Sequence, residues 1–116
     1  PQKSIYLAYR DHLSSPVHEV QDWLIANMDK PNTLRQLANR VHLSPRHLTR
    51  LFKEATGITI KSFMTQIRLE QAKILLADPQ QTVESVAARC GFKDARQLRR
   101  LWQVQIGHSP SIERKS

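Results

Sequence analysis

An internal repeat constrains the fold of this chain more than any other feature of its sequence. Nine apolar or small residues of the first half recur in the same order in the second half, displaced by 49 or 50 positions. Leu34, Leu37, Ala38, Val41, Leu43, Leu48, Leu51, Phe52 and Gly57 correspond to Val83, Val86, Ala87, Cys90, Phe92, Leu98, Leu101, Trp102 and Gly107. Thr33, Arg50 and Thr59 likewise correspond to Thr82, Arg100 and Ser109. The chain therefore contains one supersecondary unit twice.

Each copy is predicted to fold as a helix, a tight turn and a second helix. In the first copy, Thr33 followed three residues later by Gln36 is a capping-box signal for a helix that runs to about Val41. Ser44-Pro45 begins the second helix, which runs to about residue 55 and stops at Gly57. The second copy carries equivalent signals at Thr82, Gly91, Asp94 and Gly107.

Two further stretches have helical spacing. Residues 59–77 place Ile60, Phe63, Met64 and Ile67 on one face, which predicts a connector helix of about 19 residues, or roughly 28 Å. A helix begun by Ser15-Pro16 precedes the first copy, and Ser109-Pro110 predicts a short terminal helix. We expect an all-α fold of about seven helices, with two tandem helix-turn-helix units joined by the connector. The expected boundaries are an N-terminal segment at 1–14, the first helix and first unit at 15–57, the connector at 58–78, and the second unit with the terminal helix at 79–116.

The charge balance predicts a polyanionic partner. Eighteen lysines and arginines against ten acidic residues give a net charge of +8, which is typical of proteins that bind nucleic acid or an anionic membrane surface. The longest apolar run has five residues, whereas a membrane span needs about 20, so we expect no membrane-spanning segment. The single cysteine, Cys90, matches Val41 in the repeat, and we interpret it as a core residue of a cytoplasmic protein.

Basic residues gather on the second helix of each copy, where a helix-turn-helix protein contacts DNA. That helix lies in the major groove, while the first helix crosses the backbone. Its outward residues are predicted to be Arg46, His47, Thr49, Arg50 and Lys53 in the first unit, and Lys93, Arg96, Gln97, Arg99 and Arg100 in the second. These side chains suit guanine, adenine and phosphate. The predicted function is sequence-specific binding of double-stranded DNA, with two recognition helices in successive major grooves.

Four runs in this sequence, 43–53, 68–76, 86–92 and 107–110, resemble the AraC/XylS family of bacterial transcription regulators. The first helix, with Gln21-Asp22-Trp23-Leu24, is similar to the subgroup that carries a PfpI-like amidotransferase-fold domain upstream. The resemblance implies regulation of transcription, RNA polymerase as a partner and a sensor or dimerisation domain ahead of the chain. Since the chain begins with Pro1 rather than Met, we interpret it as part of a longer protein, with residues 1–14 as a linker.

The sequence departs from the family pattern at three places. His42 replaces the usual glycine of the first turn, and Glu113 replaces an aromatic residue near the end. The third departure is in the first recognition helix, which carries Arg46 and His47. This difference affects which bases the helix is expected to prefer. Because His42 aligns with Gly91, we expect it to adopt a left-handed conformation with an exposed ring.

Other classes of function have little support in the residues. The five histidines lack ligand spacing, so we expect no metal and no cofactor. We find no phosphate loop, nucleophile elbow or catalytic carboxylate pair, and we expect no enzyme. The alternatives are a basic helical RNA-binding module or a protein-interaction module. The first would use exposed aromatic side chains, whereas Trp23 and Trp102 fall in apolar stripes typical of core residues. The second leaves two basic helices unexplained.

Overall fold

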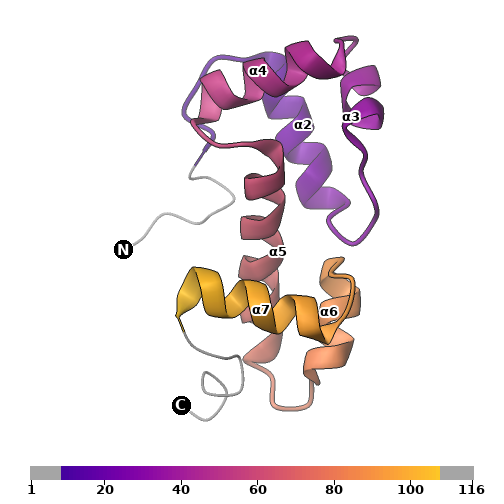
Figure 1. The fold of residues 1–116 in the computed structure, drawn as a ribbon, viewed down its shortest axis with the longest axis vertical. Helices are drawn as coiled ribbons and strands as arrows, with labels where there is room; N and C mark the ends of the chain where they lie inside the picture. Colours follow the sequence, from indigo (N-terminus) through magenta and orange to yellow (C-terminus); the bar gives the residue numbers. More distant parts are fainter. Residues whose placement is uncertain (1–8, 108–116) are drawn as a thin grey trace. The chain divides into compact units, whose positions relative to one another are not determined.

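The computed structural model describes residues 9–107, and this part of the chain is built from α-helices alone (Figure 1). The helices are α2 (Ser15–Ala26), α3 (Leu34–Arg40), α4 (Pro45–Thr56), α5 (Ile60–Leu76), α6 (Val83–Cys90) and α7 (Ala95–Ile106). The all-α prediction is therefore confirmed. The short helix expected from Ser109-Pro110 lies outside the described residues. No helix within residues 9–107 has the length and apolar character that a membrane crossing requires.

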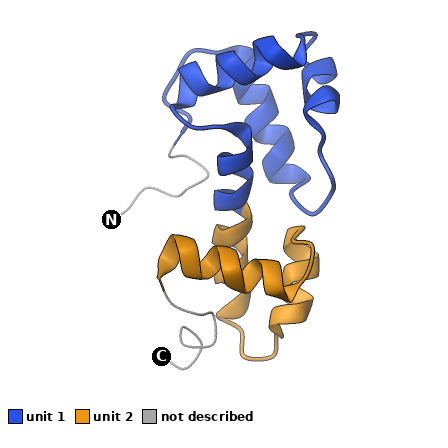
Figure 2. Cartoon of the chain, viewed as in Figure 1, with its two compact units in different colours: residues 1–67 blue, residues 68–116 orange. Residues whose placement is uncertain are grey.

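The chain divides into two compact units, residues 1–67 and residues 68–116 (Figure 2). Helix α5 belongs to both, because its first part packs into one hydrophobic core and its second part into another. Phe63, Met64 and Ile67 are buried in the first core, whereas Leu69 and Ala72 are buried in the second. The helix has 17 residues, slightly fewer than the sequence predicts, since it begins after Thr59 and ends before Ala77.

The helices of the first unit begin where local capping chemistry dictates. Thr33 Oγ1 accepts from Gln36 N at 3.1 Å while Thr33 N donates to Gln36 Oε1 at 3.1 Å, which confirms the predicted capping box. Ser44 Oγ accepts from His47 N at 3.1 Å and caps α4. For α2 the expected start was wrong by one residue, because Ser14 and not Ser15 is the N-cap.

The second unit repeats this capping pattern. Thr82 Oγ1 accepts from Ser85 N at 3.0 Å and begins α6, and Asp94 Oδ1 accepts from Gln97 N at 2.8 Å and begins α7. Helix α7 ends at Gly107 with φ 97°, as α4 ends at Gly57 with φ 83°. The two units therefore share not only apolar positions but also the N-caps that begin each helix and the glycine that ends each second helix.

Two hydrophobic cores hold these helices in place. In the first, Phe52 of α4 meets Phe63 edge-on with ring centroids 5.7 Å apart. In the second, Trp102 is fully buried, as the sequence predicts. Trp23 differs from that expectation, because its ring lies at the edge of the first core and is only half-buried. The guanidinium of Arg40 covers the exposed part of the Trp23 ring, 3.4 Å from its centroid.

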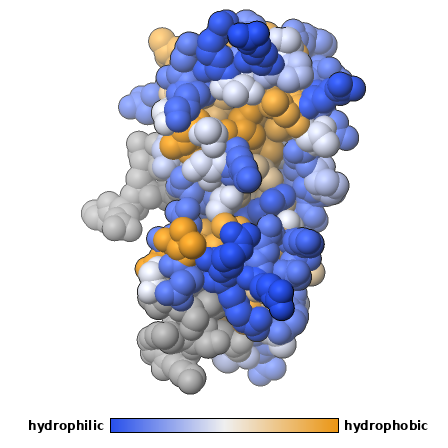
Figure 3. Space-filling view, viewed as in Figure 1, coloured by the Kyte–Doolittle hydropathy of each residue, from blue (hydrophilic) through white to orange (hydrophobic). Residues whose placement is uncertain are grey.

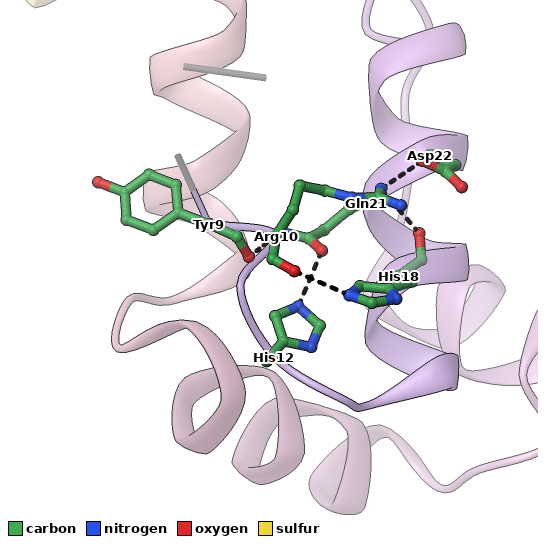
Figure 4. Close-up of polar contacts among 6 residues, drawn as sticks. All are labelled: Tyr9, Arg10, His12, His18, Gln21 and Asp22. Carbon is green, nitrogen blue, oxygen red and sulfur yellow. Dashed lines mark hydrogen bonds and ion pairs between the residues drawn. The ribbon is translucent and has the colours of Figure 1, made fainter. Parts of the chain in front are cut away.

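Residues 9–12, which we call the N-terminal clasp, are fastened to α2 (Figure 4). Gln21 is fully buried, donates from Nε2 to the carbonyl of Tyr9 at 2.9 Å, and accepts at Oε1 from His12 Nε2 at 3.1 Å. The guanidinium of Arg10 pairs with Asp22. The ring of Tyr9 also packs edge-on against Phe63 of α5, and its hydroxyl donates to Gln66 Oε1 of the same helix. The clasp is thus packed as part of the first unit, although the sequence shows only a linker there.

Candidate nucleic-acid interface

Helix α4 has a buried face and a basic face, as its predicted role requires. Leu48 and Phe52 have no exposed surface and fix the helix on the first core. The residues predicted to face outward are all exposed: Arg46, His47, Thr49, Arg50 and Lys53. Figure 3 shows hydrophilic side chains covering this helix at the top of the view. The spacing of the two apolar residues therefore directs the cations of α4 toward solvent.

The first turn of α4 forms a shallow depression suited to an anion. Its walls are Ser44, Arg46, His47 and Arg50. The first backbone N–H groups of a helix and the positive end of its dipole favour phosphate at such a place. Thr49 is engaged differently, because its hydroxyl donates to the carbonyl of Pro45 at 2.9 Å.

Helix α7 repeats this arrangement on the second core. Leu98 and Trp102 are buried, and the exposed predicted residues are Lys93, Arg96, Arg99 and Arg100. Gln97 differs from the others, because it is half-buried and its Oε1 accepts from Lys93 N at 2.7 Å. A bidentate contact with adenine uses that same oxygen as the acceptor. The second lone pair of Gln97 Oε1 can accept from adenine while the bond from Lys93 N holds the side chain in place.

Arg99 is held by a contact that sequence reasoning missed. Its Nη2 donates to Glu84 Oε1 at 3.3 Å, which ties the middle of α7 to the first turn of α6. The side chains are 50% and 69% exposed, so the pair adds little to stability. The pair places a carboxylate beside one cation of α7. The internal repeat gives no signal for the pair, since Glu84 and Arg99 align with Arg35 and Thr49, which are not an ion pair.

The turns that present the two recognition helices have the same hydrogen bonds. In the first, Leu43 N donates to the carbonyl of Ala38 at 3.0 Å; in the second, Phe92 N donates to the carbonyl of Ala87 at 2.9 Å. This pattern is a Schellman motif, which needs a left-handed residue between helix and turn. Gly91 takes that place with φ 88°, and His42 takes it with φ 58° and an exposed ring. The prediction for His42 is confirmed.

Cys90 lies in the core behind the second turn. Burial raises the pKa of its thiol to about 11, and the nearby charges of Arg89 and Arg68 oppose this rise only in part. Burial also lowers the pKa of Arg68, which lies half-buried on α5. The thiol therefore stays neutral near pH 7 and packs as a small apolar group. This supports its interpretation as a core residue.

Comparison with known proteins identifies the family. A helix-turn-helix domain model matches residues 37–116, more than half of the chain. A transcriptional regulator of Chromobacterium violaceum, described as AraC-type, superposes with a TM-score of 0.79 at 25% identity, covering 86% of this chain and 89% of that one. The chain belongs to the AraC-type helix-turn-helix family.

Two further proteins are similar to this chain, one in sequence and one in sequence and fold. The regulator Rv1931c of Mycobacterium tuberculosis is 40% identical over 81 residues, which is 70% of this chain and 31% of that protein. The DNA-binding domain of the transcriptional factor AdpA, solved in complex with a target DNA, has a TM-score of 0.81 at 32% identity and covers 88% of this chain and 92% of that one. The chain spans about a third of the length of the curated relatives that it matches.

Proposed function

We propose that this chain binds double-stranded DNA sequence-specifically and forms the DNA-binding part of a bacterial transcription regulator. The observation that carries the proposal is the repeated placement of cations opposite a buried face, on the second helix of each helix-turn-helix unit. The AdpA domain, which has the same fold, was solved with a target DNA bound. In this proposal α4 and α7 are the recognition helices, and they enter successive major grooves.

The repeat suggests which recognition residues contact base edges. Arg46 and Arg96 are both the second residue of their helix, and Arg50 and Arg100 also correspond. Residues near the start of a recognition helix contact base edges in this class of protein. We assign Arg46 and Arg96 to base contacts. The phosphate contacts are assigned to the remaining exposed residues of the two faces, namely His47, Arg50, Lys53, Lys93, Arg99 and Arg100. Thr49 can contribute once its hydroxyl leaves the carbonyl of Pro45, and Gln97 can contribute through its amide.

For the whole protein, the proposal extends to regulation of transcription in the cytoplasm. Its partners would be RNA polymerase and a sensor or dimerisation domain ahead of residue 1. Catalysis is not part of the proposed role, because the relatives are transcription regulators. The N-terminal clasp supports a coupling to an upstream domain, since it joins the chain ahead of α2 directly to the first core.

Selection of bound duplexes from a random pool tests the proposal. We expect enrichment of a sequence with two recognised segments. An unlabelled duplex of that sequence should displace the labelled duplex far better than RNA or single strands do. Preferential displacement by RNA would favour an RNA-binding module. Absence of binding to all three nucleic acids would favour a protein-interaction module.

A matched pair of variants tests the assigned surface. Arg46→Ala combined with Arg96→Ala should abolish the selected preference. Lys73→Ala removes an exposed cation from α5, outside both recognition helices, and should leave that preference unchanged. Equal effects of the two variants would mean that general charge, and not the two recognition faces, is responsible for binding.

A further inference from the structure

The two units differ in charge at one corresponding position in the first turn of their first helix. Their register is fixed by the caps, since Thr33 aligns with Thr82 and Ser44 with Asp94. Arg35 is therefore the second residue of α3, as Glu84 is the second residue of α6. A basic residue in one unit replaces an acidic residue in the other.

The partner positions on the recognition helices differ too. Arg99 is the fifth residue of α7 and bonds to Glu84 at 3.3 Å. Its counterpart is Thr49, the fifth residue of α4, whose hydroxyl donates to a carbonyl of its own helix. The pair Arg35 and Thr49 carries a net positive charge, whereas the pair Glu84 and Arg99 carries none.

Arg35 is available to a ligand. Its side chain is exposed, and within residues 9–107 it makes no hydrogen bond or ion pair. By contrast, Arg99 is bonded to the Glu84 carboxylate. Its guanidinium must leave that carboxylate, or divide its hydrogen bonds between Glu84 and the ligand, when it binds an anion. Within the described part of the chain, the first unit thus has an unpaired cation, Arg35, at this location, whereas in the second unit the cation, Arg99, is paired with Glu84.

We propose that Arg35 contacts a DNA phosphate from α3, and that Glu84 competes with DNA for Arg99 in the second unit. The first helix of a helix-turn-helix crosses the DNA backbone, so a cation in its first turn, next to the recognition helix, faces phosphate. An acidic residue at that place repels phosphate unless a cation neutralises it. This inference rests on the proposed DNA binding and identifies which unit supplies the additional backbone contact.

The test measures the binding constant for the selected duplex as a function of salt. Each phosphate contact contributes about −0.9 to the slope of log K against log salt concentration. Arg35→Ala should lower the magnitude of the slope by about 0.9 and weaken all duplexes alike, because phosphate contacts carry no sequence information. Arg35→Lys should restore most of the slope. Lys73→Ala, the control for removal of an exposed cation, should leave it unchanged.

Glu84→Gln tests the second half of the proposal. Release of Arg99 should raise the magnitude of the slope by up to about 0.9 and strengthen binding, and adding Arg99→Ala should remove both gains. Glu19→Gln removes an exposed carboxylate from α2 and controls for net charge. An unchanged slope in Arg35→Ala, or a gain in Glu84→Gln that survives Arg99→Ala, would overturn the proposal. Failure of the unaltered protein to bind duplex DNA would instead overturn the proposed function.

Discussion

His42 occupies a backbone conformation that glycine adopts without strain. At the corresponding place the second unit has Gly91, and both residues have positive φ. We expect His42→Gly to keep or raise the unfolding midpoint, because a non-glycine residue loses roughly 1 kcal/mol in the left-handed region. Thermal unfolding measures this.

The matched control is His47→Gly. His47 is also exposed but lies within α4, where glycine destabilises a helix by about 0.5–1 kcal/mol. A large loss of stability in His42→Gly would show that the imidazole makes a stabilising contact.

Gln21 is the centre of the N-terminal clasp. Its amide satisfies both the Tyr9 carbonyl and His12 Nε2 from a fully buried position. We expect Gln21→Ala to lower the free energy of unfolding by about 1–3 kcal/mol, since it leaves polar partners unsatisfied. Urea unfolding measures the loss, and Glu19→Ala, an exposed neighbour on α2, should be close to neutral. Equal stability of the two variants would mean that the clasp does not contribute to the fold.

For single residues, the sequence predicts those features that depend on residues adjacent in the chain. The caps at Thr33, Ser44 and Asp94 and the strained turn at His42 were all predicted, because each depends on a few consecutive residues. The burial of Gln21 was not, since it depends on a segment packing against a helix from outside it. A glutamine in a helix is normally assigned to the surface, and no local pattern marks this one as buried.

The recognition helices lead to a prediction at the scale of elements. Arg46→Ala and Arg96→Ala should each weaken specific binding by about 1–3 kcal/mol and relax base preference at one position. The two relaxed positions should lie about 10 base pairs apart, as successive major grooves require. Selection of duplexes with each variant reveals them. If both variants weaken all sequences equally, Arg46 and Arg96 are phosphate contacts.

Element boundaries followed from the sequence to within about one to two residues. Helix α2 begins at Ser15 after the Ser14 cap and ends at Ala26, and α5 is slightly shorter than its apolar pattern suggests. Exposure of the basic faces was also predictable, because the buried positions of α4 and α7 fix which residues point outward. The bonds of Gln97 and Arg99 were not, because they depend on rotamers and on a neighbouring helix.

The whole molecule carries a net charge of +8, which predicts strongly salt-dependent binding. If DNA binding neutralises about 6 to 10 phosphates, affinity should fall by on the order of 10³–10⁵ between 50 and 200 mM salt. A duplex titration at several salt concentrations measures the slope. A flat response would contradict binding through the phosphate backbone.

No described residue belongs to both hydrophobic cores, although one helix contributes to each. A substitution that repacks α4 therefore leaves the packing of α7 intact. In the proposed role, natural selection can consequently alter the base preference of one helix-turn-helix unit while the other still binds its DNA segment. Over many generations, a duplicated unit built in this way permits new target sites to arise through intermediates that still bind.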